Sequence, residues 1–302
     1  MSTKSIHVHG AVVPGPDLNL RKPTIAVPAH TCDCHVHIFG PPERYPLDAN
    51  RRYTPSPAGL DEYRQLQAKL GIERAVIVHP GVHLDNQVSI DAVQASGGKW
   101  RGIALLDASV TREEIKRLDD IGFRGVRFNP FNAKQVALKD LEAVAHKIAD
   151  FGWHAQFHLD ARDLPELADR FRKLPVEIVI DHMGRIPIAA GVQHPGFQTL
   201  LALLREGRTW VKLSAPNRFE DPRPPYPNLL PISQALVQTA PERCVWATDW
   251  PHSSEFGFMP NDADLVDLLA TWVPDVKTRH AILVDNPARL YRFPAEGRSN
   301  VQ

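Results

Sequence analysis

The chain has 302 residues, of which 43% are hydrophobic and 23% charged, a composition typical of a globular protein with a sizeable core. Its 35 basic and 35 acidic residues balance, so no charge excess favours a nucleic acid or an anionic membrane as a partner. The N-terminal run has no apolar segment typical of a signal peptide, and no run approaches the roughly 20 apolar residues of a membrane span. Three cysteines do not suggest a disulfide framework. We therefore expect a cytoplasmic protein.

Residues 1–30 are proline-rich and weakly periodic, and we expect them to form an extension around the domain of residues 31–302. From residue 31, short apolar runs alternate with longer amphipathic stretches, which is typical of parallel β/α architecture. The predicted strands are 31–37, 73–79, 101–106, 123–129, 153–159, 176–182, 209–214 and 244–249. The predicted helices are 60–70, 111–121, 138–150, 163–173, 196–206, 229–239, 262–272 and 275–291. This order predicts a distorted (β/α)8 TIM barrel, with a long proline-rich loop at 216–231.

The first predicted strand carries two histidines one residue apart, at the end where a TIM barrel places its chemistry. Alternation along a strand predicts that Asp33, His35 and His37 share one face. Cys32 and Cys34 then fall on the other face, where we expect them to pack between strand and helix. Two imidazoles on one face can bind a single ion or polarise a single substrate atom.

Later strands end in further groups of the same kind. His158 ends the fifth strand, His182 the sixth and Asp249 the eighth. Alternation predicts that His182 shares its face with Ile178 and Ile180. Imidazole and carboxylate ligands together suit zinc, which keeps an open position for water at catalytic sites and lowers the pKa of that water to roughly 7.

Five motifs, CDCHVHIFG, RGVRFN, IDHMGR, ATDWPH and DNPARLY, together resemble the amidohydrolase superfamily. Within it, the chain is similar to the branch of lactone hydrolases that contains 2-pyrone-4,6-dicarboxylate lactonase. The resemblance covers nearly the whole chain from about residue 30, and it implies a TIM barrel that opens a lactone ring. Carried over by motif, the catalytic residues would be His35, His37, His182 and Asp249.

The same resemblance implies a substrate-binding set. Arg127 of RGVRFN, Arg185 of DHMGR and Arg218 of APNRF would hold substrate carboxylates. His79 and His252 are further candidates for substrate contacts at the barrel rim.

Two departures from the pyrone dicarboxylate lactonases change what the resemblance implies, one for a metal and one for a second carboxylate anchor. Those enzymes resemble this chain but have a tyrosine where it has His158, and they work without metal. A histidine there restores the ligand pattern of mononuclear metal enzymes in the superfamily, so we expect one divalent metal, most plausibly zinc, bound by His35, His37, His158 and Asp249. His182 is then favoured as an acid/base or oxyanion donor, with ligation as the alternative. The relatives also have an arginine shortly after the fourth-strand motif, and Lys134 is the candidate to replace it.

The sequence therefore predicts a hydrolase that opens a small carboxylated lactone by attack of water activated by Asp249. The lactone would resemble 2-pyrone-4,6-dicarboxylate, muconolactone or a sugar-acid lactone, from aromatic or sugar-acid catabolism. The alternative is a metal-dependent decarboxylase of an aromatic or muconate-type acid, which His158 would fit. A non-catalytic sugar-acid-binding barrel is a third hypothesis, disfavoured by Asp249. Lys212 is either a buried, paired lysine or a substrate contact, and the chain is compatible with a homo-oligomer.

Overall fold

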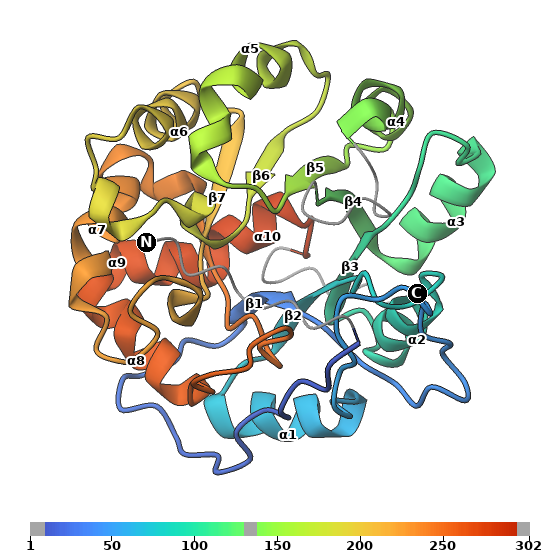
Figure 1. Cartoon of the computed structure of the whole chain (residues 1–302), viewed down its shortest axis with the longest axis horizontal. Coiled ribbons are helices and arrows are strands. Elements are labelled where there is room, and N and C mark those ends of the chain that lie inside the picture. The colour runs from blue at the N-terminus through green and yellow to red at the C-terminus, as the bar shows by residue number, and fades with distance from the viewer. Residues whose placement is uncertain (1–9, 130–137, 295–302) are drawn as a thin grey trace.

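A computed structural model describes residues 10–129 and 138–294 and contains the predicted barrel. Eight parallel strands lie in the order β1 to β8, and helices surround them (Figure 1). The strands are β1 Cys32–Val36, β2 Arg74–Val78, β3 Trp100–Ala104, β4 Phe123–Phe128, β5 His154–Phe157, β6 Ile178–Ile180, β7 Thr209–Leu213 and β8 Cys244–Trp246. The helices are α1 Leu60–Leu70, α2 Gln87–Ala95, α3 Arg112–Ile121, α4 Leu141–Ala149, α5 Leu164–Lys173, α6 Pro195–Arg205, α7 Leu230–Thr239, α8 Asp262–Trp272, α9 Val276–His280 and α10 Asn286–Leu290.

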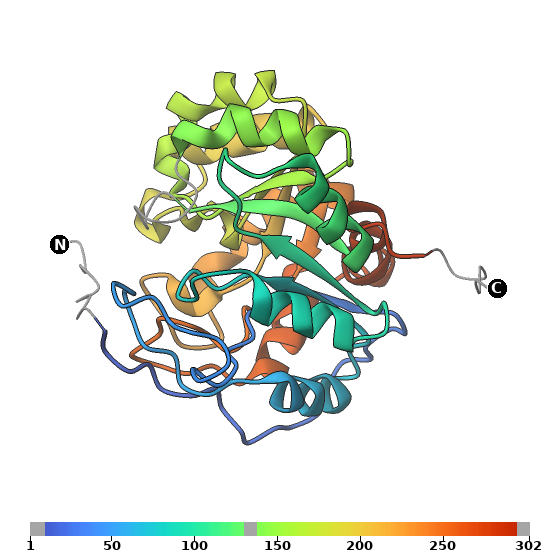
Figure 2. The ribbon, with the colours of Figure 1, turned by 90° about the vertical axis from the view of Figure 1, so that its right-hand side faces the viewer.

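The barrel has an outer apolar layer between strands and helices and a separate inner core. The inner core joins side chains of β1, β2, β3, β6, β7 and β8 with residues at the end of the chain. Arg74 and Arg101, at the starts of β2 and β3, place their guanidinium carbons 5.0 and 4.4 Å from the ring centre of Phe293. The segment after α10 therefore lies at the N-terminal end of the barrel, away from the strand ends that carry the predicted site. In Figure 2 this segment is red and lies on one side of the strands.

The prediction of which β1 side chains share a face was wrong for Cys32, Asp33 and Cys34. The register of β1 against β2 shifts between Asp33 and Val36, so simple alternation does not hold across this strand. Cys32 and Cys34 belong to the inner core, and not to the layer between strand and helix. Asp33 instead accepts a hydrogen bond from the Tyr63 hydroxyl of α1, at 3.2 Å. Cys244, by contrast, packs in the outer layer.

The barrel closes through the residues that carry the site. An isolated parallel bridge joins Val36 to Trp250. The backbone N–H of His37 donates to the carbonyl of Trp250 at 2.8 Å, and the N–H of Asp249 donates to the carbonyl of His35 at 3.1 Å. These contacts, rather than a regular ladder, hold the ends of β1 and β8 together.

Two helical predictions differ from the structure. Helix α2 was not predicted, because its β-branched residues favour a strand as readily as a helix and its N-terminal Asn86 does not cap it. The Asn86 side chain instead pairs with the backbone of Leu105, with both contacts at 2.9 Å. The predicted helix 275–291 is divided into α9, a π-helical turn at Ala281–Asp285 and α10. Pro287 has no N–H to continue an α-helical pattern there.

The remaining connections agree with the sequence. The proline-rich loop at 216–231 contains only short 3-10 turns before α7 begins. The described part of the N-terminal extension lies against α8, where Arg21 forms ion pairs with Asp264 and, at 2.8 Å, with Asp267. Among the described residues, no helix combines the length and apolar character needed to cross a membrane.

Candidate active site

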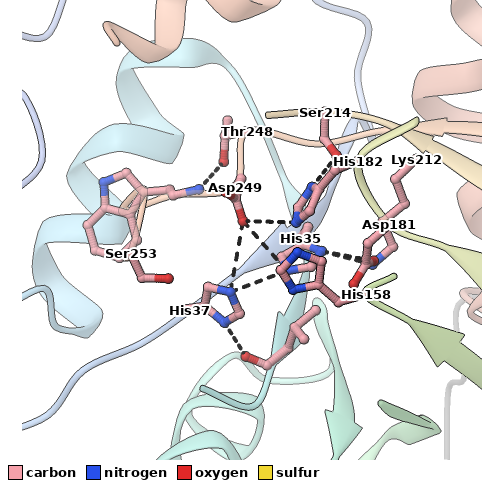
Figure 3. Close-up of polar contacts among 12 residues, drawn as sticks. His35, His37, His158, Asp181, His182, Lys212, Ser214, Thr248, Asp249 and Ser253 are labelled. Carbon is pink, nitrogen blue, oxygen red and sulfur yellow. Dashed lines mark hydrogen bonds and ion pairs between the residues drawn. The ribbon is translucent and has the colours of Figure 1, made fainter. Parts of the chain in front are cut away.

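Four of the predicted catalytic side chains converge at the C-terminal ends of the strands (Figure 3). Oδ1 of Asp249 lies 3.6 Å from Nε2 of His35, 3.9 Å from Nε2 of His37 and 3.7 Å from Nε2 of His182. The two Nε2 atoms of His35 and His37 are 3.2 Å apart. All four residues are buried, so one carboxylate oxygen faces three imidazole nitrogens away from bulk water.

His182 reaches this point by an unexpected route. Ile178 and Ile180 pack in the outer layer, whereas Val179 lies in the inner core, so the predicted shared face of His182 with the two isoleucines was wrong. A left-handed backbone at His182, with φ of 52°, turns its side chain into the site. Asp249 also has a positive φ, of 69°. Such conformations are uncommon outside glycine and concentrate at functional sites.

Two of the imidazoles are oriented through their Nδ1 atoms. Nδ1 of His37 lies 2.7 Å from the carbonyl oxygen of Val78. Nδ1 of His182 lies 2.9 Å from the Ser214 hydroxyl. Contacts of this kind fix the ring and leave Nε2 directed toward the reacting centre.

His35 differs because two side chains of opposite charge, Lys212 and Asp181, face its Nδ1. Nζ of Lys212 lies 3.3 Å away, within hydrogen-bonding distance, and Oδ1 of Asp181 also lies 3.3 Å away. Lys212 is thus a buried, paired lysine, the first of the two alternatives that the sequence left open.

Asp181 is a residue of the candidate site that the sequence did not single out, because strand alternation gives it the opposite face from the neighbouring His182. The structure places it inside the barrel, where its Oδ2 accepts from Nε of Arg127 at 3.0 Å and from Nε2 of Gln156 at 3.2 Å. Burial alone would raise its pKa, but His35, Lys212 and Arg127 outweigh burial and hold the pKa of Asp181 well below its usual range. Asp181 is therefore an ionised carboxylate beneath the histidines.

Arg218 was predicted to hold a substrate carboxylate, and in the structure it holds Asp249. Its Nε donates to Oδ2 of Asp249 at 2.6 Å. Its Nη1 and Nη2 contact the Ser254 hydroxyl at 3.2 Å and the Ser253 carbonyl at 2.6 Å. Each of the three guanidinium nitrogens therefore has a partner within the protein. Tyr53, which no motif identified, hydrogen-bonds Ser253 at the same edge, and burial raises the pKa of its hydroxyl.

His158 lies beside the site without joining the cluster around Asp249. Its ring centre is 5.3 Å from that of His182, and its Nε2 is 3.3 Å from Nη1 of Arg185. Because arginine only donates, this contact uses the lone pair that a metal would need. Ligation by His158 stays a prediction, and the geometry here favours a contact with Arg185.

The side chains of the other predicted substrate contacts pair with residues outside the cluster. His79 is buried and pairs with the Ser89 hydroxyl of α2 at 3.0 Å. His252 is buried and pairs with Asp262 of α8 at 3.1 Å. Lys134 lies outside the described residues.

The charges of the cluster follow from burial and from neighbouring groups. Burial raises the pKa of Asp249, but Arg218 and the histidines outweigh it and hold this pKa well below its usual range. Burial, followed by the charge of Lys212, lowers the pKa of His35 to about 4. Burial is also the main reason why the pKa values of His37 and His182 lie well below the ordinary histidine value. Near neutral pH the site therefore contains an ionised carboxylate and neutral imidazoles.

The donor set fits a divalent metal ion. Nε2 of His35, Nε2 of His37 and Oδ1 of Asp249 lie within 4.8 Å of one another. Oδ1 of Asp249 is buried and accepts no hydrogen bond, so this oxygen is available to bind a cation or a hydrogen-bond donor. Neutral imidazoles and a carboxylate are the ligands of catalytic zinc.

We expect the metal-free protein to lose stability as the pH falls from about 6.5 to about 4, where unfolded histidines gain protons. Burial lowers the folded pKa of His35 to about 4 and of His79 and His154 to about 3, so these stay neutral while their unfolded forms ionise. Asp33 acts in the opposite sense, because burial raises its folded pKa to about 7. Three histidines against one carboxyl leave a net uptake of about two protons on unfolding near pH 5, each worth about 1.4 kcal/mol per pH unit.

Urea denaturation between these pH values measures that slope. The variant His79→Asn should reduce it by about one proton's contribution. A free energy of unfolding that is flat or rises toward acid would contradict the assignment of neutral buried histidines.

Comparison with known proteins agrees with this geometry. A family model described as amidohydrolase matches residues 32–293. A 4-sulfomuconolactone hydrolase from Hydrogenophaga intermedia is 37% identical over 98% of this chain and 100% of its own length. A 2-pyrone-4,6-dicarboxylate hydrolase from Comamonas testosteroni is 38% identical over 92% of this chain and 95% of its own.

One solved structure has a fold similar to that of this chain. It is a probable 2-pyrone-4,6-dicarboxylic acid hydrolase from Acinetobacter baumannii, crystallised with citric acid bound. It superposes with a TM-score of 0.77 at 25% identity, over 87% of this chain and 100% of the other.

Proposed function

The chain belongs to the amidohydrolase family, and from this premise and the geometry of the site we propose that it is a lactonase that hydrolyses a small carboxylated lactone. The observation that carries the proposal is the single oxygen of Asp249, ionised and without a hydrogen bond, that faces three neutral imidazoles. This arrangement suits attack of water on a carbonyl. It places a proton acceptor beside groups that can stabilise an oxyanion.

In this reaction Asp249 takes a proton from the attacking water. Arg218 holds the other carboxylate oxygen and fixes the direction of Oδ1. When the Ser214 hydroxyl donates to Nδ1 of His182, the Nε2–H of that ring donates to the developing oxyanion. One such donor contributes roughly 3–4 kcal/mol to the stabilisation of the transition state.

We propose that His35, His37 and Asp249 hold one divalent metal, zinc, when a metal is bound. Such a metal lowers the pKa of bound water and polarises a carbonyl oxygen. The contact of His158 with Arg185 supports a different role for His158, that of orienting the arginine at the edge of the site.

The substrate is proposed from the charges around the cluster and from the relatives. The names of the two relatives specify lactones, one a sulfonated muconolactone and the other a pyrone dicarboxylate, so both carry anionic groups. Arg127 and Arg185 supply positive charge near His158 and suit a carboxylate on the ring. No observation favours the decarboxylase alternative over hydrolysis, since the decarboxylases of similar fold are only 13–14% identical to this chain.

A panel of carboxylated lactones, assayed for proton release and for carbon dioxide, tests the proposed reaction. Ring opening by water should release one proton per turnover near neutral pH and no carbon dioxide. Carbon dioxide as a stoichiometric product would replace this proposal with the decarboxylase alternative.

We expect Arg127→Met to raise KM strongly for carboxylated lactones and much less for uncharged ones. A guanidinium that pairs with a substrate carboxylate contributes only when that carboxylate is present. The matched control is Arg117→Met on the exposed face of α3, which should leave both KM values unchanged. Equal losses on charged and uncharged substrates would show that Arg127 acts only through its contact with Asp181.

A further inference from the structure

We propose that Lys212 and Asp181 compete for Nδ1 of His35 and thereby select between two tautomers of this imidazole, of which only one can bind a metal. The inference rests on the proposed function in that it takes the histidine cluster as the active site. It adds two positioning residues behind that cluster. Figure 3 shows both side chains next to His35, on the side away from Asp249.

The contacts of His37 define its tautomer. Its Nδ1 lies 2.7 Å from the carbonyl oxygen of Val78, and a carbonyl oxygen only accepts hydrogen bonds. The proton of the neutral His37 ring is therefore on Nδ1, and its Nε2 has a lone pair. Nε2 of His35 lies 3.2 Å from that atom, so the proton in the contact between the two rings comes from His35.

The other nitrogen of His35, Nδ1, faces the amine of Lys212. With the proton on Nε2, Nδ1 has a lone pair and accepts from the amine of Lys212 at 3.3 Å. The same amine donates to the Cys34 carbonyl at 2.8 Å and forms an ion pair with Oδ1 of Asp181 at 3.4 Å. The amine therefore has two hydrogen-bond acceptors, the Cys34 carbonyl and Nδ1 of His35, and one ion-pair partner inside a fully buried site. Lys212, His35, His37 and Val78 form one directional chain of hydrogen bonds.

Binding of a metal by His35 and His37 would reverse part of this chain of hydrogen bonds. Ligation needs the lone pair of Nε2 on both rings, so the His35 proton has to be on Nδ1 instead. The imidazole has one proton in either state, and its charge does not change. On Nδ1 the proton meets Oδ1 of Asp181 at 3.3 Å, an oxygen that accepts no hydrogen bond in the present structure.

The two partners of Nδ1 therefore have opposite effects. Lys212 stabilises the tautomer that presents Nε2–H, which can donate a hydrogen bond to a substrate carbonyl. Asp181 stabilises the tautomer that presents a bare Nε2, which can bind a metal. The balance between them decides whether this pair of histidines acts as a hydrogen-bond donor or as a metal site.

Nitrogen NMR of the protein with isotope-labelled histidine measures the tautomer directly. The His35 signal is assigned by its loss in His35→Gln. In metal-free wild type we expect the proton on Nε2, and after addition of zinc we expect it on Nδ1. A metal-free wild type with the proton on Nδ1 would overturn the proposal.

Two variants separate the partners, with zinc affinity as a second readout. Lys212→Met should move the proton to Nδ1 without metal and tighten zinc binding. Asp181→Asn should leave the proton on Nε2 and weaken zinc binding by about 10- to 100-fold, the usual effect of losing such a partner. If neither wild type nor Lys212→Met binds zinc, the proposal is wrong.

Arg127→Met is the matched control for charge, because it removes a nearby buried cation that does not contact Nδ1 of His35. If it tightens zinc binding as much as Lys212→Met does, and neither variant moves the proton, electrostatics alone explains the effect and the proposal fails. None of these measurements uses a lactone. A protein that passes them but opens no lactone would refute the proposed function and leave this inference standing.

Discussion

Asp249→Asn should lower kcat by about 10²-fold or more, the usual scale for loss of a general base. The amide cannot take a proton from water, although it occupies the same space and tolerates the positive φ of 69° at this position. Arg218 keeps a hydrogen-bond acceptor opposite its Nε, so we expect the fold to survive. Steady-state kinetics at saturating substrate, together with a melting curve, measures both effects.

A variant that keeps more than about half of the wild-type kcat would exclude Asp249 as the base. Loss of kcat in a protein with the wild-type melting profile would assign the defect to chemistry. Asp249→Glu provides a further check, because it restores a carboxylate but displaces it. Its kcat should exceed that of the asparagine variant if proton transfer is the missing step.

Arg218→Met should destabilise the protein by about 3–5 kcal/mol, because it leaves the buried carboxylate of Asp249 without its partner. The same change should lower kcat on both carboxylated and uncharged lactones. It should also move the acid limb of the pH profile to higher pH, because the guanidinium of Arg218 holds the pKa of Asp249 down. Urea denaturation and pH–rate profiles measure the two effects separately.

Arg218→Lys is the matched variant, since it keeps the positive charge but loses the planar contact. It should restore much of the stability and return the acid limb toward its wild-type position. A selective rise in KM for carboxylated lactones, with kcat and the pH profile unchanged, would instead make Arg218 the substrate clamp that its motif implied.

The sequence predicted the barrel because each strand is a short apolar run between amphipathic stretches, a pattern that survives local irregularity. It also predicted that His35, His37, His182 and Asp249 lie together, because strand ends in a barrel meet at one rim. The faces of individual residues were harder to predict. A register shift in β1 moved Asp33 toward Tyr63 and placed the cysteines inside the barrel.

The missed parts of the site depend on contacts between distant segments. Asp181 was not predicted as a site residue, because a left-handed turn, and not strand alternation, brings His182 inward. Arg218 lies 31 residues from Asp249 in sequence, and nothing in its motif distinguishes a partner for Asp249 from a partner for substrate. Strand alternation and local propensity carry no information on such pairings.

A single turnover in water labelled with heavy oxygen tests the central claim, which is that activated water attacks the carbonyl of a carboxylated lactone. The proposed reaction predicts one heavy oxygen in the newly formed carboxylate of the ring-opened product. The label should be absent from its hydroxyl or keto group, and the carbon skeleton should be intact. A product without label in the new carboxylate, or one shortened by loss of carbon dioxide, would contradict the account.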